Sequence, residues 1–449
     1  MENTGTNISF KRIQQLALPA IIAGISEPVL SSTDAAIVGN IANEGTASLA
    51  AAGIVGGLLS AIVWILGQTR SAISAIVSQN LGSGTISTLK TFPGQAMFAN
   101  LVLSIIIVLI AFSLTAPILH MLNAKGEIFD LSKTYYEIRI WGIPLTLFMH
   151  TMFGLFRGFQ NTFWPMVIAA IGTVLNIGLD VVLVYGIDGY LPAMNIEGAA
   201  WASLISQFVM AALALFFILK KTNVSLKPRL KKLHPEMKRL IPMSLNLFLR
   251  ATALNVALIL ATRQAAALGK EAAAAHAIAI NVWLFTAFFI DGYGAAGNIL
   301  GGKLLGEKNY SALWKLTKRV NTYNFIVALM LVALSLIFYS KIGVIFNKDP
   351  LVLTIFEGIF YLVIISLPFN SIAFTMDSIF KGMGEMAYLR NVLLGATLIV
   401  FIPLVIVSHY ANWGLSGVWI ALISWVAYRG FALIIKYRKK YIPLIQTSH

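Results

Sequence analysis

Two carboxylates stand in the first long apolar segment of the chain. Glu27 and Asp34 are seven residues apart, so on an α-helix they project from one face about 10 Å apart. Ser31 lies between them on that face. A charge at the centre of a bilayer costs about 2.5–3.5 kcal/mol, so acids at this depth are candidate functional groups. Pro19 and Pro28 each remove a backbone hydrogen bond, which gives such a helix the means to bend.

A second polar pair follows in another apolar segment. Asn176 and Asp180 are one helical turn apart and share a face. A carboxylate beside an amide oxygen suits a proton or a small hard cation such as Na⁺. The structural alternative is that Asp34 and Asp180 pair with buried donors such as Arg157 or Arg70 and hold helices together.

The second half of the chain carries its own polar set, namely Arg250, Asp291 and Asp377. Here a structural salt bridge is the simplest interpretation, because one arginine can neutralise one aspartate. The other aspartate then binds substrate, binds a proton or lies near the membrane interface. The sequence contains no HExxH, GxSxG or Walker motif and no cysteine, so we expect neither an enzyme nor a cofactor.

The elements that must position these groups are membrane helices. Of the 449 residues, 58% are hydrophobic and only 11% are charged, far from the soluble average. A helix needs about 20 apolar residues to cross a bilayer, and it satisfies its own backbone there. The sequence predicts an all-α integral membrane protein with twelve spans: 16–42, 47–81, 92–120, 132–156, 163–187, 196–220, 237–267, 273–302, 316–345, 355–380, 389–410 and 414–436.

The net charge of +15 indicates orientation rather than nucleic-acid binding. Most Lys and Arg fall in loops on one side of the predicted topology, as the positive-inside rule requires. We expect a multi-pass protein of the inner cell membrane with both termini cytosolic. The predicted parts are a cytosolic N-terminus (1–15), an N-lobe (16–220), a basic linker (221–236), a C-lobe (237–437) and a cytosolic tail (438–449).

An internal repeat relates the two halves. At an offset of 224 residues, Phe156-Arg157-Gly158 meets Phe380-Lys381-Gly382, and Leu81-Gly82 meets Leu305-Gly306. The shared register favours duplication over coincidence. Six helices per half is an even number, so both halves enter the membrane from the same side, and such parallel repeats are a transporter architecture.

Several motifs resemble the MATE (multidrug and toxic compound extrusion) family, and its DinF branch in particular. They keep the family's order over nearly the whole chain and read Leu18-Pro19, Thr33-Asp34-Ala35-Ala36-Ile37-Val38-Gly39, Asn176-Ile177-Gly178-Leu179-Asp180, Gly198-Ala199-Ala200-Trp201-Ala202-Ser203, Leu249-Arg250, Phe289-Ile290-Asp291-Gly292 and Asp377-Ser378-Ile379-Phe380. The resemblance implies two pseudo-symmetric six-helix lobes in a V shape. It also implies a monomer that exports organic, amphipathic or cationic, compounds in exchange for H⁺ or Na⁺.

The resemblance also implies roles for individual residues. Asp34 is the coupling carboxylate, beside a proton or Na⁺ network of Asn176, Asp180 and Ser203, where Ser203 replaces an expected threonine. The first helix bends at Pro19, and Glu27 is an extra acid at a position that is uncharged in the family. The alternatives are a lipid-linked precursor flippase of the same superfamily, which would need a cationic cavity, and an exporter of organic acids.

Overall fold

The computed structural model describes residues 6–42 and 44–446, except for the side chains of Glu27 and Pro28. The roles predicted for those two side chains therefore lie outside the described part of the molecule. Within it, regular structure is helical apart from one isolated β-bridge between Ile187 and Leu191. This confirms the predicted all-α class.

Eleven helical segments of the described chain are long and apolar enough to cross a membrane, and a bent pair of helices makes a twelfth. Two short helices, α5 (Thr115–Met121) and α13 (Tyr339–Phe346), lie between spans. The predicted spans are confirmed, with ends that shift by several residues. In chain order the spans are α1 (Phe10–Gly39), α2 (Gly45–Leu66) with α3 (Thr69–Gly82), η1 (Ile86–Thr91) with α4 (Phe92–Ser113), α6 (Glu127–Arg139) with α7 (Gly142–Gly158), α8 (Phe163–Tyr185), α9 (Asn195–Lys221), α10 (Pro235–Ala267), α11 (Lys270–Gly306), α12 (Tyr310–Ile337), α14 (Pro350–Gly382), α15 (Met386–Gly395) with η2 (Ala396–Phe401) and α16 (Ile402–Tyr410), and α17 (Gly414–Lys440) with α18 (Pro443–Gln446).

The fourth span is the bent one, because α6 and α7 meet at an angle of 42°. Gly142 begins α7 directly after the break, and a Cβ atom there would lie 1.9 Å from the side-chain oxygen of Gln207 on α9. Only glycine leaves room for this side chain at the bend. The sequence predicts the span at 132–156 but not the bend, since the contact joins residues far apart in the chain.

The helices group into two compact units. The N-terminal unit comprises Ile22–Ile73 and Ile86–Ile241, and the C-terminal unit comprises Met1–Ile21, Ser74–Thr85 and Pro242–His449. This grouping differs from the predicted lobes in two segments, the start of α1 and most of α3, because these early residues pack against late helices. The border inside α1 falls two residues after Pro19.

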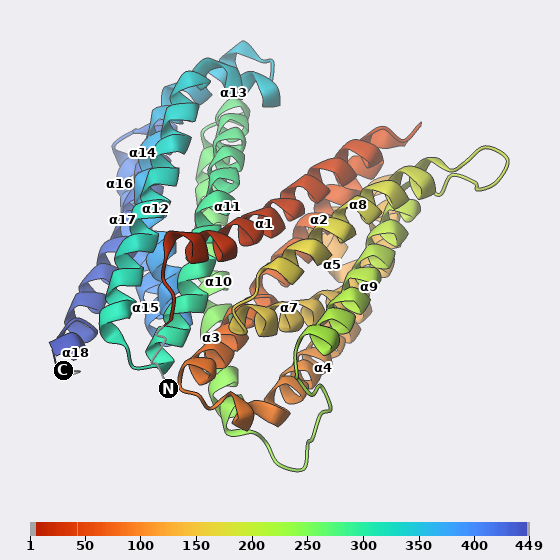
Figure 1. The fold of residues 1–449 in the computed structure, drawn as a ribbon. Coiled ribbons are helices and arrows are strands. Elements are labelled where there is room, and N and C mark those ends of the chain that lie inside the picture. Colours follow the sequence, from red (N-terminus) through yellow and green to blue (C-terminus); the bar gives the residue numbers. More distant parts are fainter. Residues whose placement is uncertain (1–5, 43, 447–449) are drawn as a thin grey trace. The chain divides into compact units, whose positions relative to one another are not determined.

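The core of the C-terminal unit is built around α14, which packs against α11, α12 and α17 (Figure 1). The buried side chains of this core include Trp419 and Trp425 on α17 and Phe356 on α14. At one end of this unit, Ile8 near the start of the chain and Leu444 near its end pack against one hydrophobic cluster. Both ends of the described chain therefore lie at the same end of the unit, as an even number of spans requires.

The crossing of α3 and α11 contains equivalent residues of the predicted repeat. A Cβ atom on Gly82 would lie 1.9 Å from the backbone oxygen of Lys303, and one on Gly306 would lie 2.0 Å from the backbone oxygen of Gln79. Gly82 corresponds to Gly306 and Gln79 to Lys303 at the offset of 224. The two contacts are thus reciprocal, which places a local twofold axis between α3 and α11.

A hydrogen bond lies at the same crossing. Ser74 Oγ donates to Asn298 Oδ1 over 3.1 Å, and these two residues are also 224 positions apart. Ser74 is fully buried and Asn298 is nearly so. Equivalent positions of the two repeats therefore touch each other at the axis.

Replacing Gly306 with Ala is expected to destabilise the protein, because the new methyl group would overlap the backbone of Gln79 and force α3 and α11 apart. Overpacking of this kind costs about 1–3 kcal/mol. Gly53→Ala in α2 is the matched control, since no atom lies within 4 Å of its Cβ position and alanine favours a helix. Thermal unfolding in detergent should show a lower Tm for Gly306→Ala alone, and equal Tm values would contradict the close approach.

Candidate functional site

The polar pair on α8 belongs to the buried face of that helix. The buried residues of α8 recur every three or four positions, and Asn176 and Asp180 fall in this series. Asn176 Nδ2 donates to Asp180 Oδ2 over 2.9 Å. Asp180 is fully buried and Asn176 is 1% exposed. The predicted pairing of these two residues on one face is confirmed.

Asp34 on α1 faces the same place within the N-terminal unit. Its carboxyl group lies within hydrogen-bonding reach of the Asp180 carboxyl group. One turn further along α1, the backbone oxygen of Ile37 accepts a hydrogen bond of 2.8 Å from the hydroxyl of Tyr185, which fastens α1 to α8. Two carboxylates this close repel each other unless a proton or another cation sits with them.

One arginine acts on this acidic pair. The guanidinium group of Arg139 on α6 interacts electrostatically with both Asp34 and Asp180. It lies over the ring of Tyr135, with 5.7 Å between the guanidinium carbon and the ring centroid. The sequence suggested Arg157 or Arg70 in this role. Arg139 could have been noticed as a cation inside the fourth apolar segment.

Buried oxygen atoms without partners occur on both acids of the pair, on Asn176 and on the neighbouring helix α9. Among the described residues, Asp34 Oδ1, Asn176 Oδ1, Asp180 Oδ1 and Ser203 Oγ are buried and have no hydrogen-bond partner. Ser203 is 3% exposed and stands on α9, which packs against α8. Buried oxygens without partners are costly. Carboxylate, amide and hydroxyl oxygens are also the groups that protons and hard cations prefer, so the residues predicted from the sequence fit such an ion chemically.

The other predicted residues of the first helix are placed differently. Ser31 is exposed and is not among the buried oxygens of this site. Pro19 is half-buried, and α1 continues through it as one helix. The bend that Pro19 was expected to produce therefore stays a prediction.

The C-terminal unit contains the predicted salt bridge. Arg250 on α10 donates to Asp377 Oδ1 on α14 through Nε at 3.1 Å and Nη2 at 2.6 Å. Both side chains are buried. Asp291 on α11 is exposed. Of the two aspartates, Asp377 is thus the one that the arginine neutralises.

Two further cations join this salt bridge. Lys381 Nζ lies 3.0 Å from Asp377 Oδ2, and Arg429 Nη2 lies 3.9 Å from Asp377 Oδ1. Arg429 is 2% exposed and sits 4.8 Å from the ring centroid of Trp425. Three cations therefore surround one buried acid. The sequence carried a signal for Lys381, which follows Asp377 by one helical turn, and for Arg429, which interrupts an apolar segment.

Comparisons with known proteins agree with this architecture. The family model described as MatE matches residues 19–182 and 247–407, one match in each half of the chain. This double match confirms the duplication. Protein DETOXIFICATION 43 of Arabidopsis thaliana is 31% identical over 336 residues, which cover 74% of this chain and 62% of that protein. DNA damage-inducible protein F of Escherichia coli (strain K12) is 23% identical, covering 96% of this chain and 92% of its own length.

Solved structures show the same fold. One described as the outward-facing conformation of a multidrug resistance MATE family transporter of the MOP superfamily has a TM-score of 0.88. It is 20% identical and covers 97% of this chain and 96% of its own. At this identity the likeness concerns the arrangement of the helices, and it spans both halves of the chain.

Proposed function

We propose that this chain, which belongs to the MatE family, is a secondary active antiporter. It exports organic compounds in exchange for H⁺ or Na⁺. The observation that carries this proposal is the facing pair Asp34 and Asp180, with its buried oxygens that lack partners. Arg139 can offset only one of the two negative charges, so such a pair needs a further cation to be stable and can couple the arrival and departure of an ion to a change in packing. We place the protein in the inner cell membrane as a monomer with both termini cytosolic.

The coupling step follows from electrostatics. In an outward-facing state, H⁺ or Na⁺ binds at Asp34 and Asp180 and removes their mutual repulsion. The packing of α1 on α8 then changes, which weakens cargo binding and releases the cargo outside. The cation leaves on the inner side when access alternates. Each charge that moves through 100 mV supplies about 2.3 kcal/mol, so one or two cations support a tenfold or larger gradient.

Asn176 and Ser203 serve this step as positioning groups. The Asn176 amide holds one oxygen of Asp180 by its hydrogen bond, which leaves the other oxygen for the ion. Ser203 offers a hydroxyl oxygen from the neighbouring helix. A Na⁺ ion would find carboxylate, amide and hydroxyl oxygens here, and a proton needs only the carboxyl pair.

The buried cations around Asp377 favour a second candidate cargo, an organic acid. Arg250, Lys381 and Arg429 outnumber the acid that they surround. Buried cations in excess attract an anionic group. The first candidate cargo, an amphipathic cation, is instead favoured by the acidic pair of the N-terminal unit.

Reconstitution tests the proposal. The purified protein in proteoliposomes should drive uphill flux of cargo when a pH or Na⁺ gradient is imposed, with a panel of organic cations and organic acids as probes. Only one of the two gradients is expected to support flux, which identifies the coupling ion. Equal flux of every probe with and without either gradient would overturn the antiporter assignment in favour of a facilitator.

A further inference from the structure

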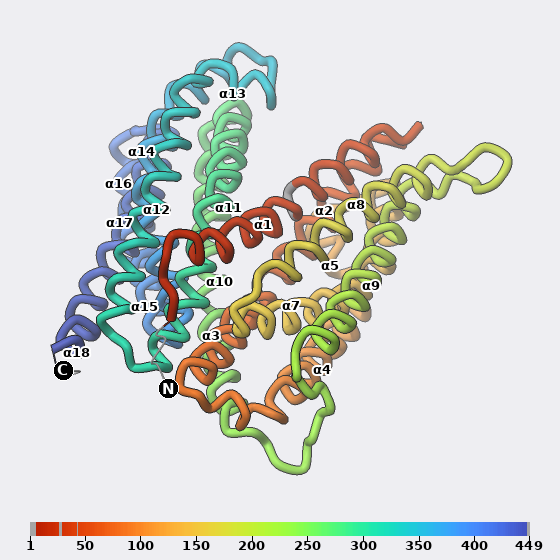
Figure 2. Tube along the Cα trace, viewed as in Figure 1, coloured from red at the N-terminus to blue at the C-terminus, as the bar shows by residue number. Residues whose placement is uncertain are grey.

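Hydrogen bonds fix the segment between α9 and α10 to helix α4. This linker, residues 222–234, leaves α9 as an extended loop and returns to begin α10 (Figure 2). The Gln95 side chain on α4 is 1% exposed and holds it by three hydrogen bonds. Its Nε2 donates to the backbone oxygens of Arg229 at 2.6 Å and Lys232 at 2.8 Å, and its Oε1 accepts from the backbone of His234 at 2.8 Å.

Two further contacts fix the same loop. The His234 ring Nε2 lies 3.0 Å from the backbone oxygen of Thr88 in η1. At Gly94, a Cβ atom would lie 2.6 Å from the backbone oxygen of Lys227, so the linker rests directly on the start of α4. A loop that only had to connect two helices would not need a buried glutamine to shape it. The contacts with Gln95, Thr88 and Gly94 therefore give the linker one defined conformation.

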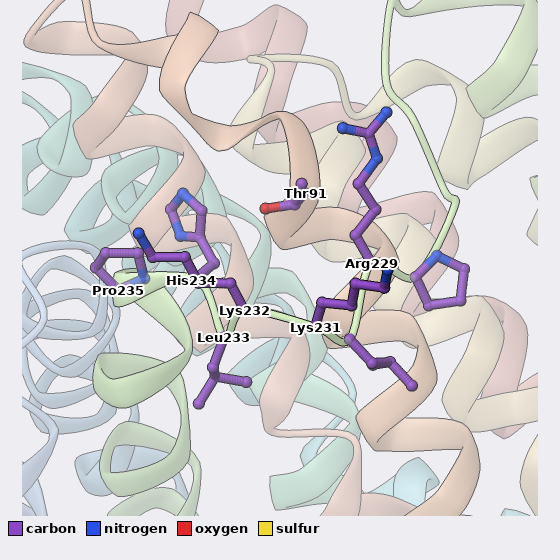
Figure 3. A pocket seen from close by; sticks show the side chains of 9 residues that line it. Thr91, Arg229, Lys231, Lys232, Leu233, His234 and Pro235 are labelled. Atoms are coloured by element: carbon purple, nitrogen blue, oxygen red, sulfur yellow. The ribbon is translucent and has the colours of Figure 1, made fainter.

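The shaped linker lines a half-open surface cavity of about 570 Å³. Thr91 and residues 228–235 line it, and Figure 3 shows the side chains of Arg229 and His234 with Thr91 between them. Arg229, Lys231 and Lys232 are three exposed cationic side chains of this lining. The linker contains no acidic residue, so the cavity is strongly positive.

Apolar side chains stand among the basic ones. Leu230 is 55% exposed and Leu233 is 49% exposed. The linker joins the ends of two candidate membrane spans, so we expect it near the lipid headgroups. Basic clusters that directly follow a membrane helix attract anionic lipids. A soluble phosphate compound would gain nothing from the exposed leucines, whereas a lipid contacts both kinds of side chain.

We propose that the linker cavity binds the phosphate headgroup of an anionic phospholipid. The headgroup phosphate contacts the side chains of Arg229, Lys231 and Lys232, and the glycerol and upper acyl chains lie against Leu230 and Leu233. Gln95 acts as a positioning residue, because it holds the backbone that presents the cations. This site lies apart from the carboxyl pair and does not depend on the transport assignment.

The test places the full chain in nanodiscs of phosphatidylglycerol mixed with phosphatidylcholine. After the protein is released from the nanodiscs, native mass spectrometry measures which lipids remain bound to it. The wild-type protein should retain phosphatidylglycerol in preference. The double variant Lys231→Gln and Lys232→Gln should lower that preference by about tenfold or more. The matched control, Lys341→Gln with Lys348→Gln, removes the same charge from exposed positions elsewhere in the chain and should leave the preference unchanged.

A second variant separates a shaped site from bulk charge. Gln95→Ala keeps every linker charge, so a role in membrane orientation alone predicts no effect, whereas the proposed site predicts a reduced preference. If this variant does not fold, the exposed lysine pair still decides the matter. Equal reduction by the two lysine pairs would overturn the proposal. Displacement of the lipid by millimolar inorganic phosphate would also overturn it, since that would indicate a site for soluble phosphate.

Discussion

Replacing Asp34 with Asn is expected to abolish ion-driven efflux while leaving a folded protein in the membrane. Asparagine has nearly the same shape, but it neither releases a proton nor offers a charge to Na⁺. It also removes the repulsion within the pair, because Asp180 then faces a neutral amide. We expect the initial rate of gradient-driven transport in proteoliposomes to fall by about a hundredfold or more, which corresponds to about 2.7 kcal/mol at RT of about 0.59 kcal/mol.

The control for this variant is Asp188→Asn. Asp188 is exposed in the loop between α8 and α9, so it loses the same charge without touching the site and should keep wild-type transport. Cargo binding measured without a gradient should be weaker in Asp34→Asn, because the neutral amide resembles the ion-loaded pair that releases cargo. Retained gradient-driven transport in Asp34→Asn would remove Asp34 from the mechanism.

Replacing Asp377 with Ala should cause the largest loss of stability. The change leaves Arg250 and Lys381 buried without the carboxylate that neutralises them. Breaking a buried ion pair by removing one partner costs about 3–5 kcal/mol, because an uncompensated charge remains. We expect a markedly lower Tm and a low yield of monodisperse protein in detergent.

Asp291→Ala is the matched control for that experiment. Asp291 is also an aspartate on a helix of the C-terminal unit and acts on Lys381 through its charge, but it is exposed, so solvent screens that interaction. Its removal should change the free energy of unfolding by about 0.5 kcal/mol or less. Equal decreases in Tm for Asp377→Ala and Asp291→Ala would show that the buried ion pair does not stabilise the C-terminal unit.

The sequence was most informative where one helix sets the geometry. Asn176 and Asp180 are one turn apart, so any helix through them brings the two side chains together, and the hydrogen bond between them confirms this. The spans were equally predictable, because length and hydropathy decide them. A salt bridge of Arg250 with one of the two aspartates was also predicted, and the structure identifies Asp377 as its partner.

The remaining features depend on contacts between distant segments. The sequence around Arg139 does not predict that α6 brings its guanidinium group to Asp34 and Asp180. The bend before Gly142 depends on Gln207, a residue of another helix. Such contacts follow from how helices pack, and a hydrophobic pattern specifies which face is buried but not which partner covers it.

The bond between Ser74 and Asn298 has an evolutionary consequence. Two identical half-length chains paired about a twofold axis would present the same residue to itself at this point, so any substitution there would appear on both sides at once. Once both copies belong to one gene, each side mutates alone. The fused chain can therefore place a short hydroxyl opposite a longer amide, an unequal match that is closed to any symmetric pair.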